Sequence, residues 1–453
     1  MSGQTLKTGH AGPLPVPATP PSERIELKVY RALTWAALPV APVILRLRER
    51  RGKEDPRRRA ERMGRSSLLR PGGQLAWIHA ASVGETSAVL PLMLELLQVR
   101  PRLELLLTTG TVTSAQFAAG RLPPRSRHQY VPLDSPPLVA RFLDHWRPDL
   151  AVFTEQEMWP NLIVEPARRG IPLALVNARM SDASFARWQQ RAGLAEALFS
   201  RFSVVLAQND ALAQRFMRLG AGRTFAVGNL KIDAPAPPID GTAYAALRAA
   251  LGDRPRLLAA STHAGEEEII AEAHLQIAAH LPGLMTIIAP RHPDRGSAVA
   301  AAISDRGLTV ERRSTGALPG PTTEVYVADT IGELGTLYAS TPVAFIGGSL
   351  VPHGGQNPIE AVRHGTAVLT GPFTHNFADP FRALTDAGGA RVVTNADGLA
   401  DAVAALLADP DALAQMQAGA TRALSSLAGA LERTVAALLP LLADPSEVRG
   451  RAV

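Results

Sequence analysis

The chain has 453 residues, enough for two or three domains, and its 46% apolar and 5% aromatic content is ordinary for a soluble α/β protein. It contains no cysteine, which excludes disulfide bonds, thiolate nucleophiles and cysteine metal sites and fits a reducing compartment. The net charge of +6 comes from residues 46–65, where basic residues outnumber acidic ones by the whole of that excess. Since no aromatic residue lies among these arginines, we predict no nucleic-acid partner.

The N-terminal segment predicts a membrane-associated helix over residues 25–48. Residues 1–24 are rich in proline and glycine and are expected to be disordered. Residues 32–45 carry no charge, begin near Trp35 and lead into the basic block. This stretch is shorter than the roughly 20 residues of a spanning helix, so we interpret it as an interfacial anchor on an anionic membrane surface. A helix packed on the N-terminal domain is the alternative.

From Leu75 onward, short apolar runs alternate with amphipathic stretches, which indicates a parallel sheet with helices on both faces. The strands expected in this half of the chain are 75–79, 103–108, 150–153, 173–176, 204–207 and 225–227, with a weaker signal at 130–131.

Acidic residues follow two of these strands. Glu85 lies in HAASVGET, where Ser82-x-x-Glu85 fits a helix-capping box, so capping is the first interpretation. The alternative is that Glu85 is a base at the carboxyl edge of the sheet, where open α/β sheets bind ligands. Glu155 lies in FTEQEMWPNLI, and a second strand-end acid in the same sheet favours a functional role.

A break in periodicity at residues 233–241 predicts a linker, which places one domain at 49–232 and another at 242–453. The last helices of the second domain are able to pack back on the first. Lys231 stands just before the linker, and taken alone it is an ordinary solvated lysine.

The second half repeats the strand–loop–helix pattern, with strands expected at 257–260, 284–289, 325–328, 343–346 and 367–369. Ser261, Thr262 and Arg291 follow two of these strands as candidate ligand contacts. The loop GGSLVPHGGQNPIEA begins after the strand at 343–346 and ends with Glu360 in a first helical turn. Its glycines and free amides predict an anion- or nucleotide-binding corner, with a plain capped loop as the alternative.

The sequence contains no HxxxH, strand-end DxD, GxxxxGK[ST] or GxSxG pattern, and its 11 histidines are scattered along the chain. We therefore predict neither a metal site nor a serine hydrolase.

Eight motifs in this order resemble the Kdo (3-deoxy-D-manno-octulosonic acid) transferases of lipopolysaccharide synthesis. They are HAASVGET, FTEQEMWPNLI, NARMS, GNLKID, STHAGEEE, APRHPDR, DTIGELGTLY and GGSLVPHGGQNPIEA. The resemblance covers the chain from about Ile25 to its C-terminal helices. It implies two Rossmann-like domains facing a cleft, the GT-B arrangement, with the acceptor bound by the first domain and the donor by the second.

The resemblance also implies roles for single residues. Glu85 corresponds to the general base, which overrides the capping interpretation, and Glu155 and Lys231 correspond to transition-state-stabilising positions. The residues that correspond to the CMP site are Pro290, Arg291, Ile331, Gly332, Glu333, Asn357, Pro358, Ile359 and Glu360.

The activity that the resemblance implies is an inverting, metal-independent and cofactor-free transfer of Kdo from CMP-Kdo to a lipid A precursor of the lipid IVA type. It would take place at the cytoplasmic face of the inner membrane, against its anionic surface. Two other interpretations are open: a non-catalytic lipid- or nucleotide-binding relative, and a sugar-nucleotide epimerase of the same architecture. The sequence makes no prediction of oligomeric state.

Overall fold

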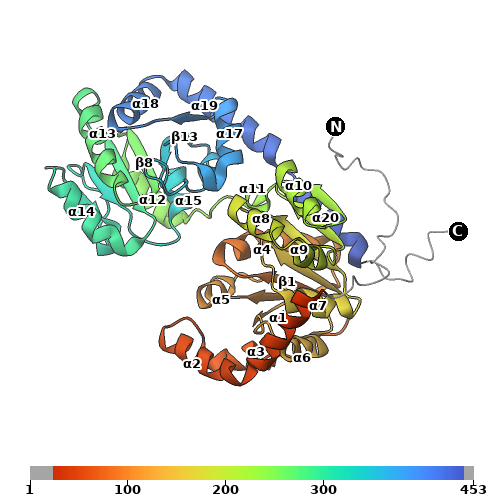
Figure 1. Cartoon of the computed structure of the whole chain (residues 1–453). Helices are drawn as coiled ribbons and strands as arrows, with labels where there is room; N and C mark the ends of the chain where they lie inside the picture. Colours follow the sequence, from red (N-terminus) through yellow and green to blue (C-terminus); the bar gives the residue numbers. More distant parts are fainter. Residues whose placement is uncertain (1–23, 443–453) are drawn as a thin grey trace. The chain divides into compact units, whose positions relative to one another are not determined.

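A computed structural model describes residues 24–442 and divides the chain into two compact units (Figure 1). Unit 1 comprises Met1–Ala234 and Ala428–Val453, and unit 2 comprises Pro235–Leu427. The chain thus enters unit 2 inside the segment expected as a linker, and it returns to unit 1 near its end. Residues 1–24 are expected to be disordered, and all of them except Arg24 lie outside the described range.

Unit 1 contains a seven-stranded sheet in the order β3-β2-β1-β4-β5-β6-β7, and every pair of neighbouring strands is parallel. Its strands are β1 (Leu75–Ala80), β2 (Glu104–Thr109), β3 (Ser126–Tyr130), β4 (Leu150–Thr154), β5 (Leu173–Ala178), β6 (Val204–Ala207) and β7 (Thr224–Ala226). The strand order changes direction between β1 and β4. Such a switch point, at the carboxyl ends of the strands, is where open α/β sheets bind ligands.

The helices of unit 1 cover both faces of this sheet (Figure 1). They are α1 (Ile25–Ala36), α2 (Ala41–Arg50), α3 (Arg59–Arg62), α4 (Val83–Val99), α5 (Val112–Ala118), α6 (Pro136–Trp146), α7 (Pro160–Arg168), α8 (Asp182–Gln189), α9 (Ala192–Phe199), α10 (Asp210–Arg218), α11 (Leu230–Asp233) and α20 (Ala430–Leu438).

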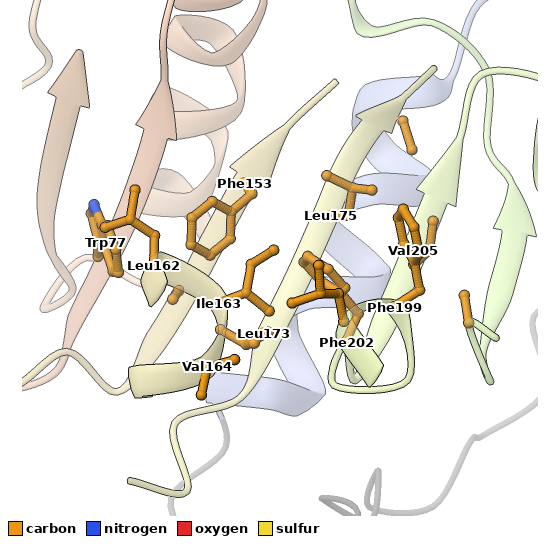
Figure 2. Close-up of a cluster of buried hydrophobic side chains, with 14 of the residues drawn as sticks. Trp77, Phe153, Leu162, Ile163, Val164, Leu173, Leu175, Phe199, Phe202 and Val205 are labelled. Carbon is orange, nitrogen blue, oxygen red and sulfur yellow. The ribbon is translucent and has the colours of Figure 1, made fainter. Parts of the chain in front are cut away.

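Successive side chains of β1 point to opposite faces of the sheet and so serve two cores. Trp77 lies in the cluster under α6, α7 and α9, where its ring centroid is 5.3 Å from that of Phe153. Figure 2 shows these two rings in one cluster with Ile163 of α7 and Phe199 of α9. Ile78 joins the other cluster, under α4 and α20.

The segment 25–48, expected as one helix, forms two. α1 and α2 are separated by a 3₁₀ turn at Leu38–Val40, because Pro39 and Pro42 lack the backbone donors of a continuous helix. The expectation of a single helix is therefore wrong.

The polar side of α1 faces the protein. The Tyr30 hydroxyl donates to Asp134 Oδ2 (2.8 Å), and Arg31 pairs with Glu165 of α7 at 2.5 Å. Asn161 of α7 donates to the Asp134 backbone carbonyl (2.9 Å) and to the Thr34 hydroxyl (3.1 Å). These partly buried contacts fix α1 on α7 and leave its apolar side outward.

The basic block is partly neutralised within its own segment. The ion pairs there are Arg48–Glu54, Arg58–Glu61, Arg59–Glu49 and Arg62–Glu54. Arg62 is buried and also donates to the Val131 carbonyl (3.1 Å), so it serves the structure of unit 1. The block is therefore less of a surface feature than the sequence predicts.

Unit 2 contains a second all-parallel, seven-stranded sheet, in the order β10-β11-β9-β8-β12-β13-β14. Its strands are β8 (Arg256–Thr262), β9 (Met285–Pro290), β10 (Val310–Arg312), β11 (Val325–Val327), β12 (Val343–Ile346), β13 (Ala367–Thr370) and β14 (Ala390–Val392). Its helices are α12 (Gly241–Leu251), α13 (Glu266–His280), α14 (Gly296–Ser304), α15 (Leu334–Ala339), α16 (Ile359–Arg363), α17 (Ala378–Asp386), α18 (Ala396–Ala408) and α19 (Pro410–Leu427). The switch point lies between β8 and β12.

Among residues 24–442, one helical stretch, Pro410–Leu442, is long and apolar enough to cross a membrane by length and composition alone. It consists of α19, α20 and a 3₁₀ turn at Leu439–Leu442, and Gly429, with a φ of +93°, separates the two α-helices. Ala420 and Ala423 of α19 lie in the core of unit 2, whereas Val435 and Leu438 of α20 lie in that of unit 1. Part of the apolar surface of this stretch is therefore packed in the two cores, and 28% of its most apolar window is buried.

The glycine-rich loop after β12 binds an internal anion. The buried Glu266 carboxylate, at the start of α13, accepts the backbone N–H groups of Gly348 (2.6 Å), Ser349 (3.0 Å) and Leu350 (3.0 Å). Further along the loop, the Gly355 amide bonds the Gly348 carbonyl. The expectation that these amides are free for a ligand is wrong, because a carboxylate of the chain itself already occupies them.

We expect Glu266→Gln to destabilise unit 2 by about 3 kcal/mol or more, because hydrogen bonds to a charged group contribute about 1.5–3 kcal/mol each and an amide offers one acceptor oxygen. All five tryptophans precede residue 190 and lie in unit 1, so their fluorescence follows that unit alone. In urea, the circular dichroism transition should move to lower concentration while the fluorescence transition stays in place. Glu272→Gln, exposed on the same helix, is the control. Equal shifts of both signals, or none, would contradict the assigned role.

Candidate functional site

Glu85 lies in the first turn of α4, directly after β1. The Ser82 hydroxyl caps the helix by accepting the Glu85 amide (3.2 Å). The Glu85 carboxylate in turn accepts the Ser82 hydroxyl (2.9 Å) and the Ala81 amide (2.8 Å). This resembles a capping box, except that the carboxylate bonds the amide one residue before the cap. Glu85 is therefore both a helix cap and a strand-end acid at the switch point.

Burial raises the pKa of Glu85 above its ordinary value, and the negative charge of Glu155 acts in the same direction. Hydrogen bonds from the Ala81 amide and from Thr154 oppose this shift. Thr154 is the last residue of β4, and its Oγ1 lies 2.9 Å from both Glu85 Oε2 and the His79 carbonyl oxygen. Because a hydroxyl has one hydrogen, it can strengthen only one of these contacts at a time.

Glu155 and Lys231 form an ion pair beside Glu85. Lys231 Nζ lies 2.6 Å from Glu155 Oε1, and a Cβ built on Gly84 would lie 3.8 Å from the same ammonium. The pair therefore adjoins the first turn of α4. Glu155 has a φ of +53°, a left-handed conformation that is uncommon for a residue other than glycine and clusters at functional sites. The structure thus brings the three predicted catalytic residues of unit 1 together.

A third carboxylate, Glu157, belongs to the same cluster. Burial raises its pKa, and the charges of Glu85 and Glu155 raise it further. His79 Nε2 lies 3.9 Å from Glu157 Oε2, while burial lowers the pKa of His79 to about 4 and keeps the ring neutral near pH 7. The sequence analysis assigns no role to Glu157, and the signal for one is its position two residues after Glu155 in the same motif.

In unit 2, Arg291 and Glu360 are near neighbours at the carboxyl edge of the sheet. Arg291 directly follows β9, is exposed, and bonds the Thr262 carbonyl through its amide (3.0 Å). Burial raises the pKa of Glu360, whereas the Asn357 amide (3.2 Å) and the positive charge of Arg291 lower it. Pro290 ends β9, Pro358 precedes α16, and Ile359 is buried, so its side chain is not available to a ligand.

The predicted residues Ile331, Gly332 and Glu333 follow β11. Ile331 is 87% exposed, and Gly332 has a φ of +91°. Arg313 Nη2 pairs with Glu333 Oε1 at 2.8 Å, and together with Thr330 it lowers the pKa of Glu333 despite partial burial. Glu333 and Arg313 also line a cavity of about 370 Å³. Because β11, β9 and β8 are adjacent and parallel, these residues share one edge of the sheet with Arg291.

Histidines that are scattered in the sequence gather at this edge. The His263 ring stacks on that of His353 at 4.1 Å, and its centroid lies 6.0 Å from that of His292. Gln356 Nε2 lies 3.0 Å from His263 Nε2. Burial, together with the charges of His353 and His292, lowers the pKa of His263 to about 4. The one sequence signal for this cluster is that each of these histidines follows a strand by a few residues.

No group of three or more His, Asp or Glu side chains is placed to hold a metal ion in the part of the chain that the structure describes. The predicted site residues fall into two sets, with Glu85, Glu155 and Lys231 on unit 1 and the nine candidate CMP contacts on unit 2.

Comparison with solved structures identifies the fold. A glycosyltransferase from Rickettsia africae ESF-5 has a TM-score of 0.58 and 11% identity, with 83% of this chain and 100% of that chain covered. This level of identity shows a shared fold alone. It confirms the expected α/β architecture of two Rossmann-like domains of the GT-B kind.

Comparison with known sequences identifies the family. The family model described as 3-Deoxy-D-manno-octulosonic-acid transferase (kdotransferase) matches residues 57–234. A probable mitochondrial 3-deoxy-D-manno-octulosonic acid transferase from Arabidopsis thaliana is 36% identical over 426 residues, covering 91% of this chain and 95% of the relative. The 3-deoxy-D-manno-octulosonic acid transferase from Haemophilus influenzae is 36% identical over 376 residues, covering 82% of this chain and 88% of the relative. The chain therefore belongs to the Kdo transferase family, and it is a glycosyltransferase.

Proposed function

We propose that the chain moves Kdo from CMP-Kdo to a lipid A precursor of the lipid IVA type, with inversion and without a metal, at the cytoplasmic face of the inner membrane. The observation that carries the proposal is the buried Glu85 carboxylate, whose pKa burial raises, beside the Glu155–Lys231 pair at the switch point of unit 1. A carboxylate with a raised pKa is a better general base near neutral pH than an ordinary one.

In the proposed reaction, Glu85 takes the proton of an acceptor hydroxyl. The hydroxyl oxygen forms a bond to the anomeric carbon of Kdo, and the bond from that carbon to the phosphate oxygen breaks. CMP leaves with the bonding electron pair, and a single displacement inverts the anomeric carbon. Lys231 offsets negative charge that develops beside Glu155, either on the Kdo carboxylate or on the leaving phosphate.

The donor contacts of the proposal come from unit 2. Arg291 is exposed and makes no ion pair among the described residues, so its guanidinium is available to a phosphate. Glu360 accepts ribose hydroxyls, a role that acidic residues at comparable positions play in dinucleotide sites. Because the loop amides at Gly348, Ser349 and Leu350 are taken by Glu266, side chains must supply much of the donor recognition.

The outward surface of α1 and α2 supports the membrane location. Ile25, Val29 and Leu33 are at least half exposed and form one stripe along α1, and α2 adds Val43 and Leu47. The basic residues that follow, Arg46, Arg50, Arg51 and Lys53, are exposed and make no ion pair with other described residues. An apolar stripe next to free cations suits the interface of an anionic leaflet.

Glu85→Gln should abolish acceptor-dependent release of CMP, with a loss of roughly 10²–10⁴-fold or more, because a general base contributes that much. Mass spectrometry of the lipid product and CMP release measure the two halves of the reaction, and the CMP affinity should be unchanged. Glu95→Gln on the same helix is the control. Transfer by Glu85→Gln at the wild-type rate would refute the proposed base. Donor turnover by the wild type without any acceptor product would instead favour an epimerase or hydrolase.

The rate of transfer should fall at acidic pH, since a base works only when deprotonated. Because burial raises the pKa of Glu85, this fall should begin at a higher pH than for an ordinary glutamate. Thr154→Val removes a hydrogen bond that lowers this pKa, so we expect the midpoint of the acid limb of kcat to move up by about one pH unit. An unchanged midpoint, with kcat lowered equally at every pH, would mean that Thr154 acts through structure alone.

Replacing Ile25, Val29 and Leu33 together by serine should weaken binding of the full chain to vesicles that contain anionic lipid. These side chains are exposed, so folding should be unaffected, and Leu94→Ser on α4 is a control of similar exposure. Vesicle flotation at low and high salt measures the apolar and ionic parts of the interaction. Equal flotation of the triple variant and the wild type would rule out α1 as the membrane surface.

A further inference from the structure

Unit 1 contains a cavity of about 510 Å³ whose walls come from the loop after β4 and from α8 with the turn that follows it. Its lining includes Glu157, Trp159, Met180, Arg187, Trp188 and Arg191. None of these residues belongs to the set that the family resemblance assigns to catalysis or to CMP. The volume falls within the range of small-molecule binding sites.

The cavity combines an aromatic wall with free cations. Trp159 is 47% exposed and Trp188 is half-buried, so part of each indole is accessible to a ligand. Arg187 and Arg191 are exposed and make no ion pair with any other described residue, and Arg187 donates only to the Ser184 hydroxyl (3.0 Å). Two unpaired guanidinium groups beside two indoles suit an amphiphile with an anionic group, because arginine binds phosphate through parallel hydrogen bonds.

Side-chain contacts hold α8, which forms one wall of the cavity, against its neighbours. α8 has no fully buried residue, yet its aromatic side chains contact residues of α9 and α10. The Trp188 ring packs edge-on against Phe199 at 5.5 Å, and the Arg215 guanidinium lies 5.6 Å from the Phe185 ring. Arg215 also pairs with Asp182 at the start of α8. A preformed site loses less conformational entropy on binding than a mobile one.

One end of the cavity adjoins the carboxylate cluster. Glu157 lines the cavity, accepts the Trp159 indole N–H (2.7 Å), and is close enough to Glu85 and Glu155 for their charges to raise its pKa. A molecule held in the cavity beside Glu157 therefore has one end near the proposed base. That is the place where the hydroxyl of an acceptor has to lie.

We propose that this cavity is the acceptor subsite, in which Arg187 and Arg191 bind a phosphate group of the acceptor glycolipid and Trp159 and Trp188 contact its sugar and acyl parts. The inference rests on the proposed function, since it names where the acceptor of that reaction binds. It makes the two arginines determinants of acceptor specificity. The competing occupant is the carboxylate of the donor sugar, which the same cations would attract.

The test compares the full-length wild type with Arg187→Gln/Arg191→Gln in steady-state transfer from CMP-Kdo. The acceptors are a phosphorylated lipid A precursor and the same lipid after enzymatic removal of its phosphates. With the phosphorylated lipid, the variant should raise the acceptor KM by roughly tenfold or more, because two charge-assisted hydrogen bonds are lost. Its kcat and its KM for CMP-Kdo should stay near the wild-type values. With the dephosphorylated lipid, the variant and the wild type should have equal acceptor KM values.

Arg102→Gln is the matched control, because Arg102 is exposed on unit 1 at the amino end of β2, the opposite edge of the sheet. A variant whose donor KM rises while its acceptor KM stays constant would assign the cavity to the donor and overturn the inference. An acceptor KM that rises equally with both lipids would also overturn it, since phosphate would then not be what the arginines bind. Absence of transfer by the wild type would reject the proposed function itself, a result distinct from either of these.

Discussion

The site of unit 1 depends on keeping the Glu85 carboxylate largely out of water. An isolated buried carboxylate is costly, so the surrounding chain has to supply donors. The Ala81 amide, the Ser82 hydroxyl and Thr154 do so without a full neutralising charge. The negative charge of Glu155 raises the pKa of Glu85, and the ion pair of Glu155 with Lys231 offsets part of that charge. Burial therefore raises the pKa of this carboxyl group, while the hydrogen bonds limit the cost of burying its ionised form.

In unit 2 the buried carboxylate at the switch point is bound by backbone amides of a glycine-rich loop. The amides of Gly348, Ser349 and Leu350 converge as the amides of a phosphate-binding loop do. The anion that they bind is the Glu266 carboxylate of the chain itself. The loop is thereby fixed from inside, and the surface above it carries His263, His353 and Arg291. An anionic ligand of this unit would meet side chains in place of backbone amides, and among these three the Arg291 guanidinium carries the positive charge.

Much of this architecture could be predicted from the sequence, because buried parallel strands are apolar on both faces and their runs stand out. The strands that the sequence missed or misplaced are β3, β10 and β14, and each lies at an edge of its sheet. Edge strands are half solvated, so SRHQY, VER and ARV lack an apolar signal. The Glu266 contact was unpredictable for another reason. Local sequence places Glu266 at a helix start, and only the tertiary fold shows that loop residues 82 to 84 positions away are its partners.

The short helix α7 connects two features that the sequence treats separately. At its N-terminus Trp159 lines the cavity of unit 1, and Asn161 and Glu165, two and six residues further on, bind the polar side of α1. Since α1 turns its apolar stripe outward, the surface that would enter a leaflet and the cavity wall are rigidly joined through one element. A lipid-linked acceptor keeps its acyl chains in the bilayer while its sugar reacts. The proposed acceptor subsite and the proposed membrane-facing helix therefore have to be held in a fixed relation, and α7 with its N-cap Trp159 supplies that connection.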